Sequence, residues 1–220
     1  MPLILTQKRY RMANELTIHD LKTLDTPISE PEKHEKPSFD KKFRYIDPIT
    51  YAVQNGLCDR SEYQAILAEI SERRRVRCNM LVFGVGYDSP LWYVTTFGFG
   101  TLIFLEDDPE WAKKAKLLPN VLKVSYGAGL EHRADHPADV LFMPLPKNVE
   151  ETDWDIIFID GPRQRTVGRM RSFYQAARLA RPGTTVFAHD ARSGLTHDLL
   201  QRHFPDREIE FVNNLARLVV

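Results

Sequence analysis

Five short apolar runs, each followed by a glycine or a polar residue, constrain the fold of this chain more than any other feature. The runs span residues 80–83, 102–105, 121–124, 156–159 and 184–188. Continuous apolar runs of this length are typical of strands buried on both faces, as in a parallel sheet covered by helices. A helical pattern over 170–180, closed by Arg181-Pro182-Gly183, separates the last two runs. The sequence therefore predicts an α/β domain.

The last residues of the sequence narrow this prediction. Two further β-type runs, 208–212 and 216–220, flank Asn213-Asn214-Leu215. Strands joined so tightly must be antiparallel, because a parallel crossover needs about a dozen residues. A nucleotide-type parallel sheet that finishes in an antiparallel hairpin is typical of the Rossmann-like class I methyltransferase fold. We therefore expect a mostly parallel seven-stranded sheet with an antiparallel hairpin at its end.

The first part of the sequence has a different character. Residues 1–45 are polar and interrupted by Pro27, Pro31 and Pro37, so this segment lacks the apolar residues of a packed core. We interpret it as an N-terminal arm or linker. Residues 46–220 are expected to form the domain, with a leading helix capped by Asp59 or Ser61.

Charge and cysteine content bear on partners and compartment. The chain has 30 Lys+Arg and 30 Asp+Glu, so no overall field attracts nucleic acid, and we expect no nucleic-acid partner. No apolar stretch reaches the roughly 20 residues of a membrane span, so we expect no membrane segment in the chain as given. Cys58 and Cys78 either remain free thiols or pair in an oxidising compartment.

A glycine turn follows the first apolar run. In Gly84-Val85-Gly86-Tyr87-Asp88-Ser89, the glycines allow a sharp bend and a close approach to a ligand, and the next helix presents its N-terminus. A dinucleotide fingerprint would have a third glycine where Ser89 stands. A plain tight turn would have the same pattern, so the turn alone does not establish a cofactor site.

An acidic residue at the end of the second run strengthens the cofactor hypothesis. Glu106 lies about twenty residues after the glycine turn, where a carboxylate accepts hydrogen bonds from ribose hydroxyls. This pattern fits NAD and S-adenosylmethionine equally, and the missing glycine and the terminal hairpin favour S-adenosylmethionine. The candidate cofactor-binding residues are Gly84, Gly86, Asp88, Ser89, Glu106 and Asp107.

The fourth and fifth runs end in polar residues that are candidates for catalysis. Asp160 ends the fourth run, and His189 and Asp190 end the fifth. Ligands of open parallel sheets bind beyond the carboxyl ends of the strands. If these strands are neighbours, the three side chains converge on the methyl group. Either His189 or Asp160 acts as a general base on a hydroxyl, or Asp160 and Asp190 hold a divalent metal that lowers the pKa of that hydroxyl.

Arginines lie close to these residues in the sequence. Arg163 and Arg165 follow Asp160, and Arg169 begins the next helix. Arginine binds carboxylates and phosphates through two parallel hydrogen bonds, so these residues are candidates for binding the substrate. The alternative is an exposed loop whose arginines serve solubility.

With these motifs in place, the chain resembles the plant glucuronoxylan 4-O-methyltransferase family, also called the DUF579 or polysaccharide biosynthesis group. The resemblance lies in residues 78–92, 104–111, 154–162, 168–170 and 186–190. It implies that S-adenosylmethionine binds at Gly84, Gly86 and Glu106. It also implies that the acceptor is a sugar hydroxyl, in the best-known members that of a glucuronic acid residue, whose carboxylate the arginines near Asp160 would bind.

The sequence departs from the family pattern at several points. Tyr87 stands where plant members carry histidine, and Gly161-Pro162-Arg163-Gln164 replaces Ala-Pro-Thr-Gly. The N-terminal anchor of those Golgi enzymes is also missing, so we expect a soluble protein, cytoplasmic if the chain is complete and in the Golgi lumen if an anchor was removed. The main hypothesis is O-methylation of a sugar or uronic acid. The alternatives are a small-molecule O- or N-methyltransferase, an NAD-dependent oxidoreductase and an inactive methyltransferase-like scaffold.

Overall fold

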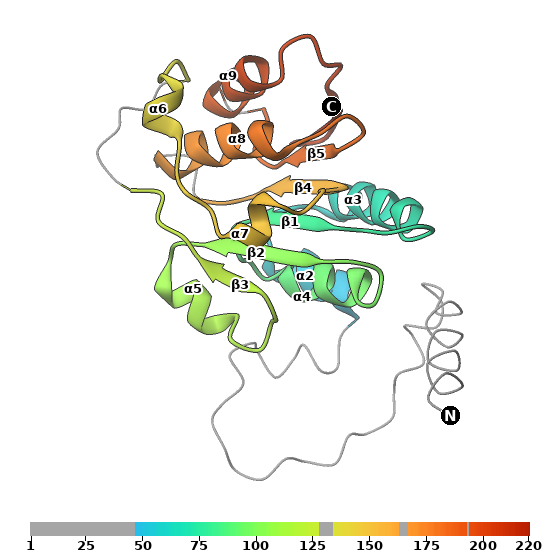
Figure 1. Ribbon diagram of the computed structural model, residues 1–220. Helices are drawn as coiled ribbons and strands as arrows, with labels where there is room; N and C mark the ends of the chain where they lie inside the picture. The colour runs from blue at the N-terminus through green and yellow to red at the C-terminus, as the bar shows by residue number, and fades with distance from the viewer. Residues whose placement is uncertain (1–46, 128–133, 163–166, 193) are drawn as a thin grey trace, which may run out of the picture.

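The structure is a computed structural model that describes residues 47–127, 134–162, 167–192 and 194–220. At its centre lies a seven-stranded sheet with the strand order β3-β2-β1-β4-β5-β7-β6, part of which Figure 1 shows as neighbouring arrows. The strands are β1 (Met80–Phe83), β2 (Leu102–Glu106), β3 (Val121–Lys123), β4 (Ile156–Ile159), β5 (Thr185–Ala188), β6 (Glu210–Val212) and β7 (Leu215–Val219).

The register of the sheet brings particular strand ends together. β1 pairs in parallel with β2 and β4, and β4 pairs in parallel with β5, with Ile159 opposite Ala188. The segments that follow β1, β2, β4 and β5 therefore lie side by side at the carboxyl ends of these strands. β7 lies between β5 and β6 and is antiparallel to both. The predicted fold is confirmed, including the antiparallel hairpin.

Helices cover both faces of the sheet. One face packs against α2 (Pro48–Asn55), α3 (Arg60–Arg73), α4 (Ser89–Thr96) and α5 (Pro109–Lys114). The other packs against α6 (Ala138–Leu141), α7 (Lys147–Glu150), α8 (Val167–Leu179) and α9 (Gly194–His203). β1, β2, β4 and β5 are buried along their whole length, which is why their runs are apolar without alternation.

The leading helix begins at a local signal in the sequence. The Asp59 side chain accepts a hydrogen bond from the Glu62 N–H, and the Glu62 side chain accepts one from the Asp59 N–H. This reciprocal capping box fixes the start of α3. Of the two predicted caps, Asp59 is the residue that is used. Tyr63, Ile66 and Ile70 are buried on the side of α3 that faces the sheet.

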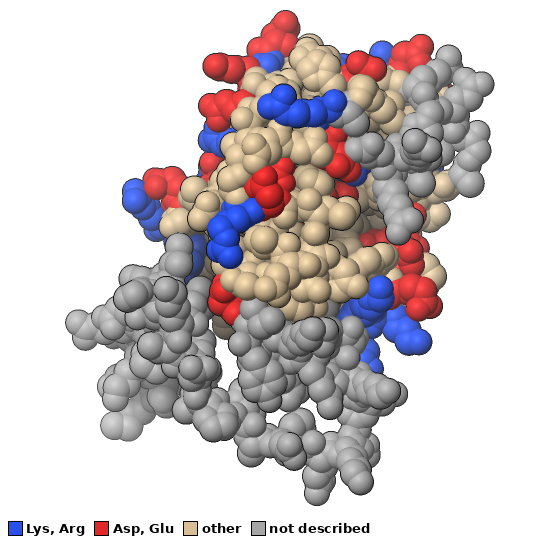
Figure 2. Space-filling view, turned by 180° about the vertical axis from the view of Figure 1, so that it is seen from behind, with Lys and Arg blue, Asp and Glu red and all other residues tan. Residues whose placement is uncertain are grey.

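The predicted arm, 1–45, lies outside the described residues, so the domain boundary stays a prediction. Among the residues that are described, no helix combines the length and the apolar character needed to cross a bilayer. Cys58 and Cys78 are free, buried thiols. On the face drawn in Figure 2, acidic and basic side chains are interspersed among uncharged residues.

Candidate active site

The turn after β1 depends on the absence of side chains. Gly84 has a φ of +103°, a conformation that residues with a Cβ rarely adopt, and a Cβ there would lie 2.8 Å from the Cα of Gly161. The Gly84 N–H donates to the Leu105 carbonyl at 2.8 Å. The turn after β1 is therefore packed directly against the turn after β4.

Glu106 is fixed beside this turn at the end of β2. Its Oε2 accepts a hydrogen bond from the Val85 N–H at 2.7 Å, and its Oε1 accepts from the N–H groups of Asp107 and Asp108 at 2.9 and 2.7 Å. Burial raises the pKa of Glu106, and the backbone donors offset only part of that effect. Because each carboxylate oxygen has about two acceptor sites, Oε1 is fully used by these donors and Oε2 can still accept one hydrogen bond from a ligand.

Two predicted cofactor residues shape the turn itself. The Ser89 hydroxyl accepts from the Gly86 N–H at 2.9 Å, so Ser89 closes the bend at the start of α4. Asp88 is buried beneath it, and a Cβ on Gly86 would lie 2.7 Å from Asp88 Oδ1. Burial, together with the charge of Asp160, raises the pKa of Asp88 to about 7.

The structure brings the three predicted catalytic residues together. His189 Nδ1 lies 3.2 Å from Asp160 Oδ1 and 3.7 Å from Asp190 Oδ1. The side chains of Asp160 and Asp190 are 25% and 26% exposed, whereas that of His189 is 3% exposed. The two carboxylates can therefore be reached from outside, and the imidazole lies behind them.

The charge state of His189 follows from its surroundings. Burial lowers its pKa, but the carboxylates of Asp160, Asp190 and Glu62 outweigh burial and raise the pKa above the usual histidine value. A general base must be unprotonated before it acts. The surroundings of His189 therefore disfavour the unprotonated ring that a general base needs.

Arg169, a predicted substrate residue, is buried at the start of α8. Its side chain is 1% exposed, and its guanidinium donates to the carbonyl oxygens of Ile159 and Asp160, both at 3.2 Å. It also lies 3.5 Å from Asp190 Oδ2. These contacts indicate that Arg169 holds the ends of β4 and β5 together, and substrate contact by this residue stays untested. Arg163 and Arg165, the other two predicted substrate residues, lie outside the described residues.

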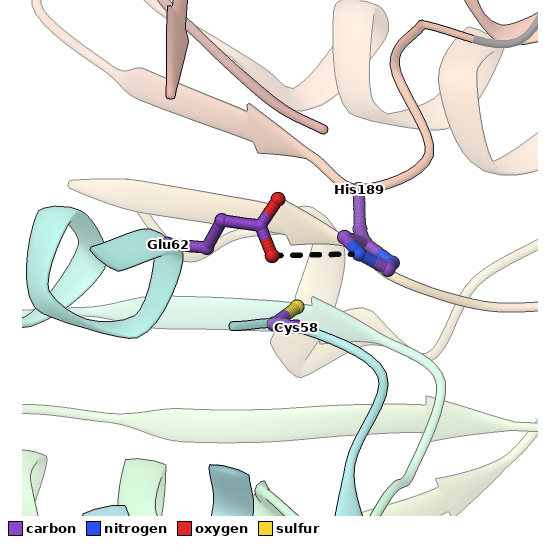
Figure 3. Close-up of side chains that lie close together, drawn as sticks. All are labelled: Cys58, Glu62 and His189. Atoms are coloured by element: carbon purple, nitrogen blue, oxygen red, sulfur yellow. Dashed lines mark ion pairs between the residues drawn. The ribbon is translucent and has the colours of Figure 1, made fainter. Parts of the chain in front are cut away.

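Two residues that lie beside His189 were not predicted from the sequence as part of this site. Glu62, on α3, lies 3.8 Å from His189 Nε2 through its Oε2, and its Oε1 accepts from the Asn214 N–H at 2.7 Å. Cys58, in the segment before α3, also faces this group (Figure 3). The capping box was visible in the sequence, but it predicts only the start of a helix.

The predicted metal pair has other partners. Asp190 Oδ1 accepts from the Asn214 side chain at 3.1 Å, and Asp190 Oδ2 faces Arg169. Within the described ranges, the group of three ligand-type side chains whose atoms lie close together is Cys58, Glu62 and His189. A metal held by Asp160 and Asp190 stays a prediction.

The sequence matches the family model described as IRX15/IRX15L/GXM over residues 61–135 and 130–210. The matched region includes the glycine turn, Glu106 and the ends of β4 and β5. The chain belongs to the IRX15/IRX15L/GXM family.

Two relatives in this family come from Arabidopsis thaliana. Glucuronoxylan 4-O-methyltransferase 1 is 33% identical over 162 residues, which cover 58% of this chain and 57% of that protein. Arabinogalactan O-methyltransferase 2 is 32% identical over 175 residues, covering 64% and 60%. The matched part of this IRX15/IRX15L/GXM chain thus spans little more than half the length of these relatives.

A solved structure agrees with the fold of this IRX15/IRX15L/GXM member. A Staphylococcus aureus protein assigned as a caffeoyl-CoA O-methyltransferase superimposes with a TM-score of 0.54 over 81% of this chain and 94% of that chain. The two sequences are 15% identical, so the comparison concerns the fold alone. That fold is the class I methyltransferase fold, as predicted from the apolar runs and the terminal hairpin, and the observed strand order agrees with it.

Proposed function

We propose that this protein is an S-adenosylmethionine-dependent O-methyltransferase that methylates a hydroxyl of a sugar or uronic acid. Family membership supports the proposal, since relatives in the family are named for O-methylation of glucuronoxylan and arabinogalactan. The observation that carries it is the position of Glu106, locked by the Val85 N–H beside the glycine turn.

The residues around the turn fit the donor. Gly84 allows the sharp turn after β1, where its Cα packs against Gly161, and Glu106 keeps one free acceptor site on Oε2 for a ribose hydroxyl. Ser89 closes the bend with its hydrogen bond from Gly86, Asp88 is buried next to it, and Asp107 lies half-buried next to Glu106. When bound, the donor supplies a methyl group on a positively charged sulfonium, a charge that the nearby carboxylates complement.

At the ends of β4 and β5, where the acceptor would meet the methyl group, the reaction requires a group that takes the proton of the acceptor hydroxyl. Asp160 is the best placed candidate, because its carboxylate is partly exposed and lies beside His189, whose side chain is buried. In this proposal Asp160 contacts the acceptor and accepts its proton, and His189 positions Asp160. Asp190 is held by Arg169 and Asn214. Together with Asp160 it forms an acidic rim, the two partly exposed carboxylates at the ends of β4 and β5.

The acceptor class follows from the relatives' names and from the predicted arginines. An acceptor that carries a uronic acid would present a carboxylate, which arginine binds in a two-pronged arrangement. Arg163 and Arg165 stay the predicted partners of that group. A neutral arabinogalactan sugar would not use them. Replacing both arginines by glutamine should therefore raise the KM for an acceptor that carries a uronic acid and leave the KM for a neutral sugar unchanged.

Calorimetry tests the donor half of the proposal. S-adenosylhomocysteine is expected to bind and NAD is not. Replacing Glu106 by glutamine should weaken S-adenosylhomocysteine about tenfold to a hundredfold, the usual value of one hydrogen bond to a charged group. Glu110→Gln, on the exposed first turn of the neighbouring helix, is the matched control and should leave affinity unchanged. Equal binding of NAD would reject the proposal.

Transfer of a labelled methyl group tests the acceptor half. Glucuronoxylan, arabinogalactan and a catechol are offered separately, and labelled polysaccharide is expected from one of the first two. Asp160→Asn should lower kcat by at least about a hundredfold, the lower range for loss of a general base, and leave S-adenosylhomocysteine affinity within a few-fold. Labelling of the catechol alone would reject the sugar acceptor.

A further inference from the structure

Three side chains that approach from different parts of the fold meet beside the predicted catalytic residues. The Cys58 thiol comes from the segment between α2 and α3, the Glu62 carboxylate from the first turn of α3, and the His189 imidazole from the end of β5. One ligand atom of each lies within 4.8 Å of the other two, and all three residues are buried. Figure 3 shows the thiol, the carboxylate and the ring turned toward a common space.

The ligand types match one class of cation. Thiolate, imidazole and carboxylate are the ligands of zinc in proteins, and a thiolate disfavours magnesium and calcium. Metal binding would release the proton of the Cys58 thiol to solvent, and the resulting thiolate and the Glu62 carboxylate would carry the two negative charges that balance a divalent ion. Neither Cys58 nor Glu62 has a role in the methyl-transfer proposal, so that proposal does not explain this group.

The spacing also suits a metal ion. Ligand atoms bound tetrahedrally at about 2.0–2.3 Å from zinc lie roughly 3.5 Å apart. Glu62 Oε2 and His189 Nε2 already lie 3.8 Å apart, and the widest separation in the group is within 4.8 Å. Side-chain rotations that move the ligand atoms by about one ångström would therefore bring them to the spacing of a tetrahedral zinc site.

The outer contacts are those that zinc ligands usually have. A metal-bound histidine directs its second ring nitrogen at a carboxylate, which fixes the ring. Here Nε2 faces Glu62, and Nδ1 lies 3.2 Å from Asp160. Glu62 is itself held by two backbone donors, the N–H groups of Asp59 and Asn214, each at 2.7 Å. The ligand atoms and the groups that orient them are therefore both present.

The balance of charge around the group favours an added cation. Glu62 and Asp88 are buried, and Asp160 and Asp190 lie at the rim. Arg169, a buried guanidinium beside them, contacts Asp190 and two carbonyl oxygens rather than Glu62. Buried carboxylates are stable when they are paired or coordinate a metal.

We propose that Cys58, Glu62 and His189 bind one zinc ion, or a divalent ion of similar ligand preference. Three protein ligands leave a fourth position for water. The ion would tie the segment before α3 to the end of β5, next to Asp160. This inference is independent of the proposed function, because it concerns metal uptake in the absence of donor and acceptor.

Cobalt substitution tests the site directly. The full chain is stripped with a chelator under reducing conditions and titrated with Co²⁺, whose bond to a thiolate gives a charge-transfer band in the near ultraviolet. The wild-type protein is expected to take up one equivalent with this band, and Zn²⁺ should displace it. Failure of the wild-type protein to bind either ion, or binding without the thiolate band, would overturn the proposal.

Variants assign the ligands. Cys58→Ser should abolish the band and weaken Zn²⁺ at least about a hundredfold, whereas Cys78→Ser, which alters the other buried free cysteine, should retain both. Glu62→Gln should weaken Zn²⁺ and keep the band. Circular dichroism confirms that each variant is folded. A band that persists in Cys58→Ser contradicts the assignment.

A last variant separates this site from the predicted aspartate pair. Asp190→Asn keeps a residue type that tolerates the positive φ of 59° at this position. If Cys58, Glu62 and His189 are the ligands, Asp190→Asn binds one Co²⁺ with the band intact. Loss of Co²⁺ binding in folded Asp190→Asn would instead place the ion at Asp160 and Asp190 and reject the proposed ligand set.

Discussion

Gly84 and Gly161 lie backbone to backbone. A Cβ on Gly84 would lie 2.8 Å from the Cα of Gly161, and a Cβ on Gly161 would lie 2.7 Å from the Cα of Gly84. Real Cβ atoms essentially never approach other atoms so closely. The contact sets the distance between the proposed donor turn, after β1, and the proposed reacting end of β4. Displacing one turn therefore displaces the other.

Gly161→Ala should consequently impair both stability and donor binding. Overpacking of a dense site costs about 1–3 kcal/mol of unfolding free energy, measurable by urea denaturation, and S-adenosylhomocysteine affinity should fall as the glycine turn moves. Gly194→Ala is the control, because a Cβ at Gly194 meets no described atom within 4 Å. A Gly161→Ala protein as stable as the wild type would show that the two turns move independently.

Arg169→Lys tests the positioning role of the buried guanidinium. Lysine keeps the charge but cannot reach both carbonyl oxygens and Asp190 with the same planar geometry. We expect kcat to fall and the pH profile of kcat to shift, while the KM for the methyl donor stays within a few-fold. Arg178→Lys, on the same helix and paired with Glu150 near the surface, should change neither. An unaltered pH profile in Arg169→Lys would leave Arg169 with a structural role alone.

The surroundings of His189 predict a pH dependence of stability with a definite sign. Its pKa in the metal-free folded protein is raised above the usual value. Its contribution is therefore fully present below the unfolded-state pKa of about 6.5 and is lost as the pH rises through the higher folded-state pKa. The difference in unfolding free energy between the metal-free wild-type protein and His189→Gln should thus shrink as the pH rises above about 6.5.

His203 provides a control of opposite sign. Burial, with Arg202 nearby, lowers its pKa to about 4, so the neutral form is the stable one. Its contribution is lost as the pH falls from about 6.5 toward 4. His203→Gln should therefore differ less from the wild-type protein at low pH than at neutral pH. Parallel trends for the two variants would contradict the assigned charge states.

Asp88→Asn should stabilise the protein at alkaline pH. Burial and the Asp160 charge raise the pKa of Asp88 from its ordinary value of 3.8 to about 7, so ionisation of Asp88 opposes folding. The penalty begins as the pH rises through the unfolded-state pKa and is complete above the folded-state pKa. It then amounts to roughly a few kcal/mol, because each tenfold change in proton affinity corresponds to about 1.4 kcal/mol.

Urea denaturation at two pH values measures this effect. Asp88→Asn should gain unfolding free energy over the wild-type protein at about pH 8 and much less at about pH 5. Asp153→Asn, whose carboxylate is exposed beside Arg181, serves as the control. A gain for Asp88→Asn that is equal at both pH values would indicate that the change acts through packing rather than through ionisation.

The sequence was sufficient for the sheet and for the convergence of Asp160, His189 and Asp190. Fully buried strands leave an apolar run without alternation, and polar residues that end neighbouring parallel strands must meet. The burial of Arg169 could not be predicted in the same way, because the start of α8 has the same sequence pattern whether its arginine faces solvent or the strand ends. Its burial follows from how α8 packs over β4 and β5, which no local pattern records.

The position of Glu62 could also be predicted only in part. The spacing of Asp59 and Glu62 identifies a helix start, yet its contact with His189 depends on how α3 lies against β5 and the last hairpin. For Cys58, the sequence showed only that the thiol is either free or paired, and not that it lies beside His189. Contacts between residues more than a hundred positions apart depend on tertiary packing, and a single sequence gives no signal for them.

The place of β7 between β5 and β6 has a consequence for biosynthesis. Glu62 leaves the ribosome long before Asn214, its hydrogen-bond partner 152 residues further along the chain. Until residues 215–219 emerge, β5 is an unpaired sheet edge, a form that invites association with other nascent chains. Translation that stalls before the hairpin should therefore yield an aggregation-prone intermediate, and cells that produce this protein would benefit from chaperones that cover that edge.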